Sequence, residues 1–420
     1  MSLAEPSGEN WTPLDPGAVR RDFPIFSSAT AHRLHYLDNA ATTQKPGAVI
    51  DAITNSYTQH YAPIHRGLYP LAEQATGSYE RARATLQRFI GAGSPDELVF
   101  THSATDAINR VASGWLKPRL RRGDSVWVSR MEHHSNYLPW QRVCRETGAQ
   151  LKVIELTQDG QLDLLGTPEL FGERTRFIAV THVSNVLGIE NPVAALCARA
   201  RHHDIPVLVD AAQSVSHLEL DVEAMCCDFL AFSAHKMFGP TGIGLLYGRA
   251  DRLRDMVPSQ VGGGMVDVVG EGGEESLWAQ SPARFEAGSP DMPGAVGFAA
   301  AAHYLVGLGR DRVRRHVATL TRRAAEQLSA LADIRLLPHA ELPSSGIVSF
   351  THRALHPHDL AQVAGEAGVA IRAGHHCAQP LLGGLGLAAT ARASFSVYND
   401  ESDIQALVAA IVEAQKVFCA

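Results

Sequence analysis

Positive charge and reactive thiols are both scarce in this 420-residue sequence. The net charge is −7 and no long basic run occurs, so the electrostatic footprint of a nucleic-acid or anionic-membrane binder is missing. Six cysteines without a Cys-x-x-Cys pair argue against a disulfide framework, a zinc knuckle and a thioredoxin-like centre. No uninterrupted run of about 20 apolar residues occurs, and residues 1–10 lack the basic start of a signal peptide. We expect a cytoplasmic protein whose partners are small molecules or proteins, with no nucleic acid and no membrane.

The motifs of several common enzyme classes are absent as well. The sequence has no Gly-x-x-x-x-Gly-Lys-[Ser/Thr] phosphate loop, no Gly-x-Ser-x-Gly nucleophile turn and no His-Glu-x-x-His zinc motif. The glycines of residues 239–244 lack the dinucleotide-binding spacing and precede a predicted strand instead of a helix. Few amines are available for chemistry, since the lysines are Lys45, Lys117, Lys152, Lys236 and Lys416.

The pattern of apolar runs predicts an α/β fold. A chain of 45.2 kDa is too large for one ordinary core, since domains typically contain roughly 100–200 residues. Between residues 97 and 248, short apolar runs alternate with helix-like stretches, which is typical of βαβ units around a mainly parallel sheet. The predicted strands are Leu98–Phe100, Ser125–Ser129, Leu151–Leu156, Phe177–Thr181, Val207–Asp210, Phe229–Phe232 and Ile243–Tyr247.

The pattern changes after this region. Residues 262–294 are rich in glycine and predict an extended loop, and loops of this length are usually functional. The remainder predicts an α+β arrangement of one or two long helices at Gly294–Leu331, a strand at Gly346–Phe350, a helix at His358–Glu366, a strand at Val369–Arg372 and a terminal helix at Ser402–Phe418. We assign residues 35–295 to a large domain, and residues 1–34 and 296–420 to a smaller α+β domain.

Polar and reactive side chains follow five of the predicted strands. Ligands of open α/β sheets bind beyond the carboxyl ends of the strands, so these positions are the first candidates for a site. They are Ser103 to Thr105, Glu132 to His134, His182 with Ser184 and Asn185, Asp210 with Gln213, and Ser233 with His235 and Lys236.

Lysine, aspartate and histidine at strand ends are the residue types that a pyridoxal phosphate site requires. A lysine amine forms a Schiff base with the cofactor's aldehyde, and a carboxylate keeps the pyridine nitrogen protonated so that the ring accepts electrons. A planar side chain covers the ring face, and the helix start after Ser103 offers backbone N–H groups to the phosphate. Singly, Asp210 is explained as a helix N-cap, His133 as a core histidine and Lys236 as a solvated loop charge. Their combination favours the cofactor site.

A second polar cluster, Arg372-Ala-Gly-His-His-Cys377-Ala-Gln-Pro380, falls in a predicted loop of the smaller domain. The consecutive residues His375, His376 and Cys377 are poorly spaced to chelate one ion, so no metal site is predicted. A cysteine among histidines and near an arginine favours a nucleophilic thiol, because cationic neighbours stabilise the reactive thiolate.

With these motifs the sequence resembles the group II, SufS-like cysteine desulfurases, which are fold-type I (aminotransferase class V) pyridoxal phosphate enzymes. The resemblance runs from about Arg21 to the C-terminus. It depends on Tyr36-Leu-Asp-Asn-Ala-Ala-Thr-Thr-Gln-Lys-Pro46, His65-Arg-Gly67, Met131-Glu-His-His134, Thr181-His-Val-Ser-Asn-Val-Leu-Gly188, Val209-Asp-Ala-Ala-Gln213, Ser233-Ala-His-Lys236, Arg284-Phe-Glu-Ala-Gly-Ser-Pro290 and Arg372-Ala-Gly-His-His-Cys377.

The resemblance implies a fold-type I transferase fold, a homodimer, and conversion of L-cysteine to L-alanine. The sulfur is left as a persulfide on Cys377 and passes to a SufE-like or SufU-like acceptor protein for iron–sulfur cluster biogenesis. Lys236 is the implied Schiff-base lysine, Asp210 pairs with the pyridine nitrogen, Gln213 bonds the phenolic oxygen and His133 stacks on the ring. The implied phosphate ligands are Ala104 through its backbone N–H, Thr105, Ser233, His235 and, from the partner subunit, Ser289. The implied substrate-binding residues are Asn185 and Arg392 at the carboxylate, with His65 and Arg372 elsewhere in the pocket.

Some positions depart from the family pattern, and several alternatives stay open. Ala104 and Ser289 stand where threonine is frequent in the family, and Ala211 stands where glycine is common. The alanine at position 104 removes one possible phosphate-binding hydroxyl, while its backbone N–H donor remains. A further hypothesis is that His358 helps to dock a zinc-carrying acceptor, although a solvated loop explains it equally well. A selenocysteine lyase would use the same residues, whereas an aminotransferase or epimerase of this fold would not need Cys377. An inactive scaffold is disfavoured because the reactive residues are retained together.

Overall fold

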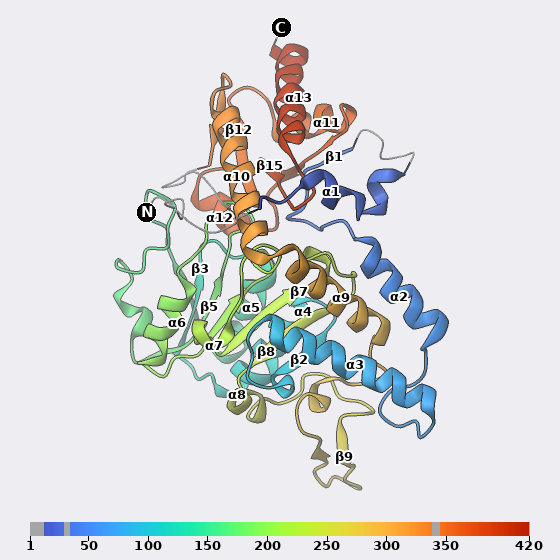
Figure 1. Ribbon diagram of the computed structural model, residues 1–420. Coiled ribbons are helices and arrows are strands. Elements are labelled where there is room, and N and C mark those ends of the chain that lie inside the picture. Colours follow the sequence, from blue (N-terminus) through green and yellow to red (C-terminus); the bar gives the residue numbers. More distant parts are fainter. Residues whose placement is uncertain (1–11, 29–33, 338–344, 420) are drawn as a thin grey trace.

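The computed structural model describes residues 12–28, 34–337 and 345–419 (Figure 1). Residues 1–10, for which no signal peptide is predicted, lie outside the described residues, as do residues 29–33 of the predicted small domain. Within the described ranges no single helix is both long and apolar enough to cross a membrane. The bent pair α9 (Met292–Leu308) and α10 (Arg310–Ser329) passes that test only when its two helices are taken together.

The larger sheet has seven strands, and all of them except β8 run in the same direction. This mainly parallel arrangement confirms the predicted fold class. Each of the seven strands predicted between residues 97 and 248 is present within two residues of its predicted bounds. The order across the sheet is β2 (Leu98–Thr101), β8 (Gly244–Gly248), β7 (Phe229–Ser233), β6 (Val207–Asp210), β5 (Thr175–Thr181), β3 (Ser125–Ser129) and β4 (Gln150–Ile154).

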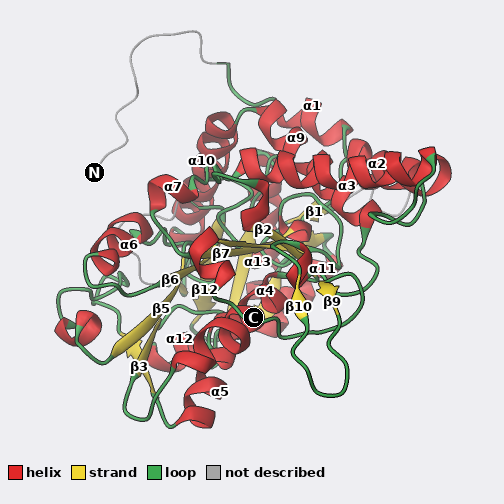
Figure 2. Cartoon of the chain, turned by 90° about the horizontal axis from the view of Figure 1, so that it is seen from below, coloured by secondary structure: helices red, strands yellow, loops and turns green. Residues whose placement is uncertain are grey.

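Two helical layers cover the faces of this sheet (Figure 2). Side chains alternate along each strand, so Phe177 and Ala179 of β5 face one layer while Ile178 and Val180 face the other. The first layer contains α4 (Ala104–Arg110), α5 (Leu138–Thr147) and α8 (Ala250–Arg254). The second contains α3 (Pro70–Phe89), α6 (Val193–Arg201), α7 (Val222–Met225) and α9, and α2 (Gly47–Gln59) lies along α9. Burial on both faces explains why the parallel strands are apolar throughout.

A second, antiparallel sheet lies at the top of Figure 1 and forms the α+β part of the chain. Its order is β11 (Ile334–Leu336), β12 (Ile347–His352), β15 (Thr390–Ser394) and β14 (Arg372–Gly374). Leu328 of α10, Leu360 of α11 (Pro357–Glu366) and Leu407 of α13 (Glu401–Cys419) belong to one apolar cluster with this sheet. Near the N-terminus, β1 (His35–Tyr36) pairs in parallel with β13 (Val369–Ala370), while α1 (Pro16–Arg21) precedes it. The division at residue 295 into two domains stays a prediction.

Two local predictions differ from the structure. Residues 262–294, predicted as an extended loop, contain an antiparallel pair, β9 (Val266–Val268) and β10 (Leu277–Trp278). The strand predicted at Val369–Arg372 is divided between β13 and β14, which belong to different sheets. Strands of two or three residues are too short for alternation of side chains to be visible in a sequence.

Candidate active site

One cavity of about 420 Å³ lies at the carboxyl ends of the parallel strands. Every cofactor- and substrate-binding residue that the resemblance implies lines it except His65 and Ser289, whereas the strand-end candidates Glu132, His134, His182 and Ser184 do not. The residues that follow strands of the large sheet reach one edge of it because those strands run in the same direction, whereas Arg372, Cys377 and Arg392 come from the second sheet and the loop after β14. The predicted residues that line the cavity are Ala104, Thr105, His133, Asn185, Asp210, Gln213, Ser233, His235, Lys236, Arg372, Cys377 and Arg392.

Lys236 and Asp210 come from neighbouring strands. Asp210 is the last residue of β6, and Lys236 ends the short 3-10 turn that follows β7. Burial lowers the pKa of the Lys236 amine and raises the pKa of the Asp210 carboxyl. A bound pyridinium would favour the ionised carboxylate, since a nearby positive charge offsets the cost of burial. This pair therefore fits pyridoxal phosphate.

Hydroxyl and backbone N–H groups, among them predicted phosphate ligands, gather at the start of α4. The Ala104 N–H donates to Ser233 Oγ at 2.8 Å, and Thr105 Oγ1 lies 2.7 Å from Ser135 Oγ. A side chain at Gly244 would place its Cβ only 2.6 Å from the Ser103 carbonyl carbon. Glycine on β8 thus allows the sheet to approach the backbone at the start of α4. The predicted backbone donor of Ala104 is present and already paired with a predicted phosphate ligand.

The ring of His133 is neutral and held in place. Burial, with a smaller contribution from Lys236, lowers the pKa of His133 to about 3. The backbone N–H of Ser135 donates to His133 Nδ1 at 3.1 Å, which leaves the ring proton on Nε2. A neutral, oriented ring is suited to stacking on a flat cofactor.

Cys377 lies in a loop that follows β14. Hydrogen bonds from two other segments of the site fix the backbone of this loop. The His134 N–H donates to the Cys377 carbonyl at 2.7 Å, and Asn185 Nδ2 donates to the His376 carbonyl at 2.8 Å. His376 and Cys377 have φ values of 51° and 53°, a left-handed conformation that is uncommon outside glycine. These contacts keep the exposed cysteine at the cavity wall. Among the described residues, no group of three or more His, Cys, Asp or Glu side chains is arranged to hold a metal ion.

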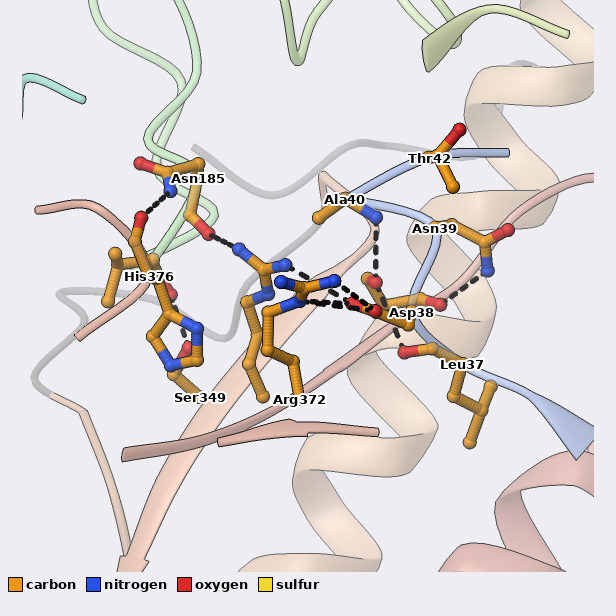
Figure 3. Close-up of polar contacts among 12 residues, drawn as sticks. Leu37, Asp38, Asn39, Ala40, Thr42, Asn185, Ser349, Arg372 and His376 are labelled. Atoms are coloured by element: carbon orange, nitrogen blue, oxygen red, sulfur yellow. Dashed lines mark hydrogen bonds and ion pairs between the residues drawn. The ribbon is translucent and has the colours of Figure 1, made fainter. Parts of the chain in front are cut away.

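Arg372 and Arg392 line one end of the cavity, and Asp38, which does not line it, pairs with both of them; Figure 3 shows Asp38 beside Arg372. Arg372 makes a bidentate ion pair with Asp38, with a shortest distance of 2.7 Å. Arg392 is fully buried, lies 3.4 Å from Asp38 and donates to the Asn185 carbonyl at 2.8 Å. Both guanidinium groups line the cavity, so this end suits an anionic group such as a carboxylate.

His65 and Ser289 lie elsewhere in the same chain. They line a separate cavity of about 690 Å³ between residues 61–66 and 263–292. Leu68, close to this cavity in sequence, is 95% exposed, and Tyr61 in its wall is 58% exposed. This chain by itself does not bring either residue to the Lys236 cavity.

The family model described as aminotransferase class-V matches residues 35–407. The chain belongs to this family. A cysteine desulfurase from Salmonella newport (strain SL254) is 44% identical over 399 residues, covering 95% of this chain and 98% of the relative. These findings confirm the resemblance predicted from the sequence.

Solved structures of this class-V family share the fold closely. The cysteine desulfurase CsdA from Escherichia coli, in its S-sulfonic acid form, is 35% identical with a TM-score of 0.89, covering 96% of this chain and 99% of that one. The apo cysteine desulfurase from Thermococcus onnurineus NA1 is 36% identical with a TM-score of 0.91, covering 97% and 99%. The predicted fold class is confirmed.

Sequence reasoning assigned no role to several residues that organise this class-V site. Ser135 links His133 to Thr105, and Asp38 holds the arginine pair. The His235 carbonyl accepts hydrogen bonds from Thr42, Thr43 and Lys45, with Lys45 Nζ at 2.9 Å. Most of these contacts join segments more than 100 residues apart, so no local pattern signals them. Residues 36–46, one of the motifs that carry the resemblance, contain Asp38 and Lys45. This motif is the signal in the sequence that points to the two residues.

Glu132 is a fully buried carboxyl beneath the site. It accepts hydrogen bonds from the Ser129 hydroxyl, the Asn136 amide at 2.6 Å and the Thr181 N–H at 2.8 Å. These contacts join the ends of β3 and β5 next to His133. Burial nonetheless raises the pKa of Glu132 to about 8.

Replacing Glu132 with glutamine is expected to weaken the pH dependence of stability. Because the folded-state pKa is raised from 4.5 to about 8, the contribution of Glu132 is full below about pH 4.5 and is lost as pH rises through about 8. The stability advantage of wild type over Glu132→Gln should therefore shrink between about pH 5 and pH 8. Urea unfolding midpoints measure this difference, with the exposed Glu173→Gln as control. If the stability difference between wild type and Glu132→Gln stays constant from pH 5 to pH 8, the predicted ionisation of Glu132 in this range is wrong.

Proposed function

We propose that the protein is a pyridoxal phosphate-dependent cysteine desulfurase that converts L-cysteine to L-alanine and takes the sulfur onto Cys377 as a persulfide. One observation carries this proposal: Lys236, Asp210 and Cys377, from separate elements, line a single cavity. The aminotransferase and epimerase alternatives give no reason for a cysteine at that position. The cysteine desulfurases among its relatives support the same reaction.

The residues present fit the cofactor. Lys236 would hold its aldehyde, Asp210 its pyridine nitrogen, Gln213 its phenolic oxygen and His133 its ring face. The phosphate would be bound by the Ala104 backbone, Thr105, Ser233 and His235. When bound, pyridoxal phosphate supplies an electrophilic carbon for amines and a ring that accepts electrons.

The protein's own groups account for the remaining steps. Arg392 and Asn185 would hold the substrate carboxylate, which fixes the substrate sulfur toward the Cys377 loop. Lys236 Nζ, whose pKa is lowered by burial, would move the α-proton of the substrate. The Cys377 thiolate then attacks the substrate sulfur, so that an S–S bond forms as the C–S bond of L-cysteine breaks, and the electron pair of that broken bond takes up a proton at the β-carbon to complete alanine. Alanine leaves, and the persulfide stays on the exposed cysteine.

The persulfide would next pass to a SufE-like or SufU-like acceptor protein in the cytoplasm, for iron–sulfur cluster biogenesis. Exposure of Cys377 supports this transfer. We also propose a homodimer in which Ser289 reaches the phosphate of the partner's site and His65 completes a substrate pocket. The exposed apolar side chains beside their shared cavity support such an interface.

Assays of the purified holoenzyme test the proposed function. We expect a visible absorption band from the lysine-linked cofactor, and equal amounts of alanine and sulfide from L-cysteine under a reductant. A band without cysteine turnover would overturn the desulfurase assignment and direct attention to selenocysteine or transamination substrates. Absence of the band after incubation with pyridoxal phosphate would overturn the cofactor assignment.

A further inference from the structure

His134 contacts the loop of Cys377 through both its backbone and its ring. Its backbone N–H donates to the Cys377 carbonyl at 2.7 Å, and its Nε2 accepts a hydrogen bond from the Gln379 N–H at 3.3 Å. His134 begins the short 3-10 turn after β3 of the large sheet, whereas Cys377 follows β14 of the second sheet. The two hydrogen bonds therefore join the loop of the reactive cysteine to the edge of the other sheet.

The ring of His134 must be neutral to make its hydrogen bond. An imidazole nitrogen that accepts a hydrogen bond carries no proton, so the ring proton of His134 lies on Nδ1. Burial, followed by the neighbouring His375, lowers the pKa of His134, which favours this neutral form. The ring centroid of His375 lies 5.7 Å from that of His134, and His375 Nδ1 accepts from the Cys377 N–H at 3.1 Å. Two histidine rings thus accept backbone N–H groups at and just after the cysteine.

The backbone at Cys377 has a conformation that needs such support. His376 and Cys377 both have positive φ, which costs free energy for residues other than glycine and persists where several surrounding contacts fix it. Asn185 holds the first of them through the His376 carbonyl (Figure 3), and His134 holds the second through the Cys377 carbonyl. The ring of His134 adds the hydrogen bond at Gln379, so the chain is fixed on both sides of the thiol.

We propose that the His134 side chain is a positioning residue for sulfur transfer: by accepting the Gln379 N–H it keeps Cys377 in the left-handed conformation that presents its thiol to the substrate. This inference rests on the proposed persulfide chemistry of Cys377. His134 does not line the cavity, unlike its neighbour His133. Loss of the His134 ring should therefore slow sulfur transfer and leave the binding of cofactor and substrate unchanged.

Two substitutions separate the acceptor atom from the space that the ring fills. His134→Phe keeps a ring of similar size without an acceptor, whereas His134→Gln places an amide oxygen near the position of Nε2. We expect His134→Phe to lower kcat for alanine formation by about tenfold, since a displacement of about 1 Å at a reacting atom costs up to about 100-fold in rate. KM for L-cysteine and the visible band should stay near their wild-type values, and His134→Gln should restore most of kcat.

Hydrogen exchange of the loop gives a readout that does not need turnover. The backbone amides of residues 375–380 are followed by mass spectrometry on the holoenzyme. They are expected to exchange about two- to tenfold faster in His134→Phe than in wild type, which is the change that corresponds to loss of one hydrogen bond. His134→Gln should return the exchange toward the wild-type rate. His202, exposed at the end of α6, supplies the control, and His202→Phe should change neither kcat nor loop exchange.

Three outcomes would overturn the proposal. The first is an unchanged kcat or an unchanged loop exchange in His134→Phe. The second is an equal loss of kcat in His134→Phe and His134→Gln, and the third is a raised KM together with a weakened visible band, which would mean a general structural defect. If wild type does not convert L-cysteine, the proposed function fails instead, and the exchange rates still decide whether His134 holds the loop.

Discussion

Replacing Cys377 with alanine is expected to reduce alanine formation from L-cysteine by at least about 10³-fold, while the visible band of the holoenzyme stays intact. The reason is specific to sulfur transfer: without the Cys377 thiol, no group in the cavity wall can accept the substrate sulfur. The neighbouring groups that bind cofactor and substrate are unaffected, because Cys377 contacts its surroundings mainly through its backbone. Alanine release and the absorption spectrum, measured on the same sample, separate the two effects.

Cys226 offers a matched control for this substitution. It is a partly exposed free cysteine that does not line the cavity, so Cys226→Ala should keep wild-type turnover. Equal activity of Cys377→Ala and wild type would disprove the persulfide mechanism. The fold and the cofactor site would be unaffected by that outcome.

Replacing Lys236 with alanine is expected to remove both the lysine-linked cofactor band and turnover, again by at least about 10³-fold. Lys236 is the lysine that lines the cavity, and burial lowers the pKa of its amine, which favours the neutral, nucleophilic form. The same amine is expected to move the substrate α-proton, so binding and proton transfer are lost together. Spectra recorded with added pyridoxal phosphate, and alanine release from L-cysteine, measure both losses.

Lys416 supplies the control, since its side chain is 68% exposed on the last helix. Lys416→Ala should show the wild-type band and rate. Retention of the lysine-linked band in Lys236→Ala would mean that another amine holds the cofactor. Lys45 would then be the first candidate, because burial lowers its pKa to about 8 and its amine contacts the His235 carbonyl.

The strands of the large sheet could be predicted because the apolar pattern of each strand lies within a short stretch of sequence. Parallel strands buried on both faces are short apolar runs, and such runs are visible at residues 98–101, 207–210 and 229–233 without knowledge of the partner strands. Their common direction then places the residues after them at one edge, so Asp210 and Lys236 could be expected to meet. Two-residue strands such as β1 carry no such pattern and were missed.

The contacts that orient the site were not predictable in this way. Asp38 lies more than 300 residues before Arg372 and Arg392, and His134 holds the loop of Cys377 across a similar distance. A side chain's neighbours across such distances depend on how the two sheets pack. His65 and Ser289 line another cavity of this chain, and their predicted places, His65 in the substrate pocket and Ser289 in the partner subunit's site, stay predictions.

By itself the sequence determined the fold class, the family and the candidate reactive residues, because apolar patterning and the positions of lysine, aspartate and cysteine can be recognised within short segments. Only the tertiary structure decided which charges meet. The pKa of a buried group and the net charge of a cavity depend on neighbours and burial, and long-range packing sets both. The pairing of Asp38 with both Arg372 and Arg392 is therefore visible only when β14, β15 and the N-terminal segment are seen together.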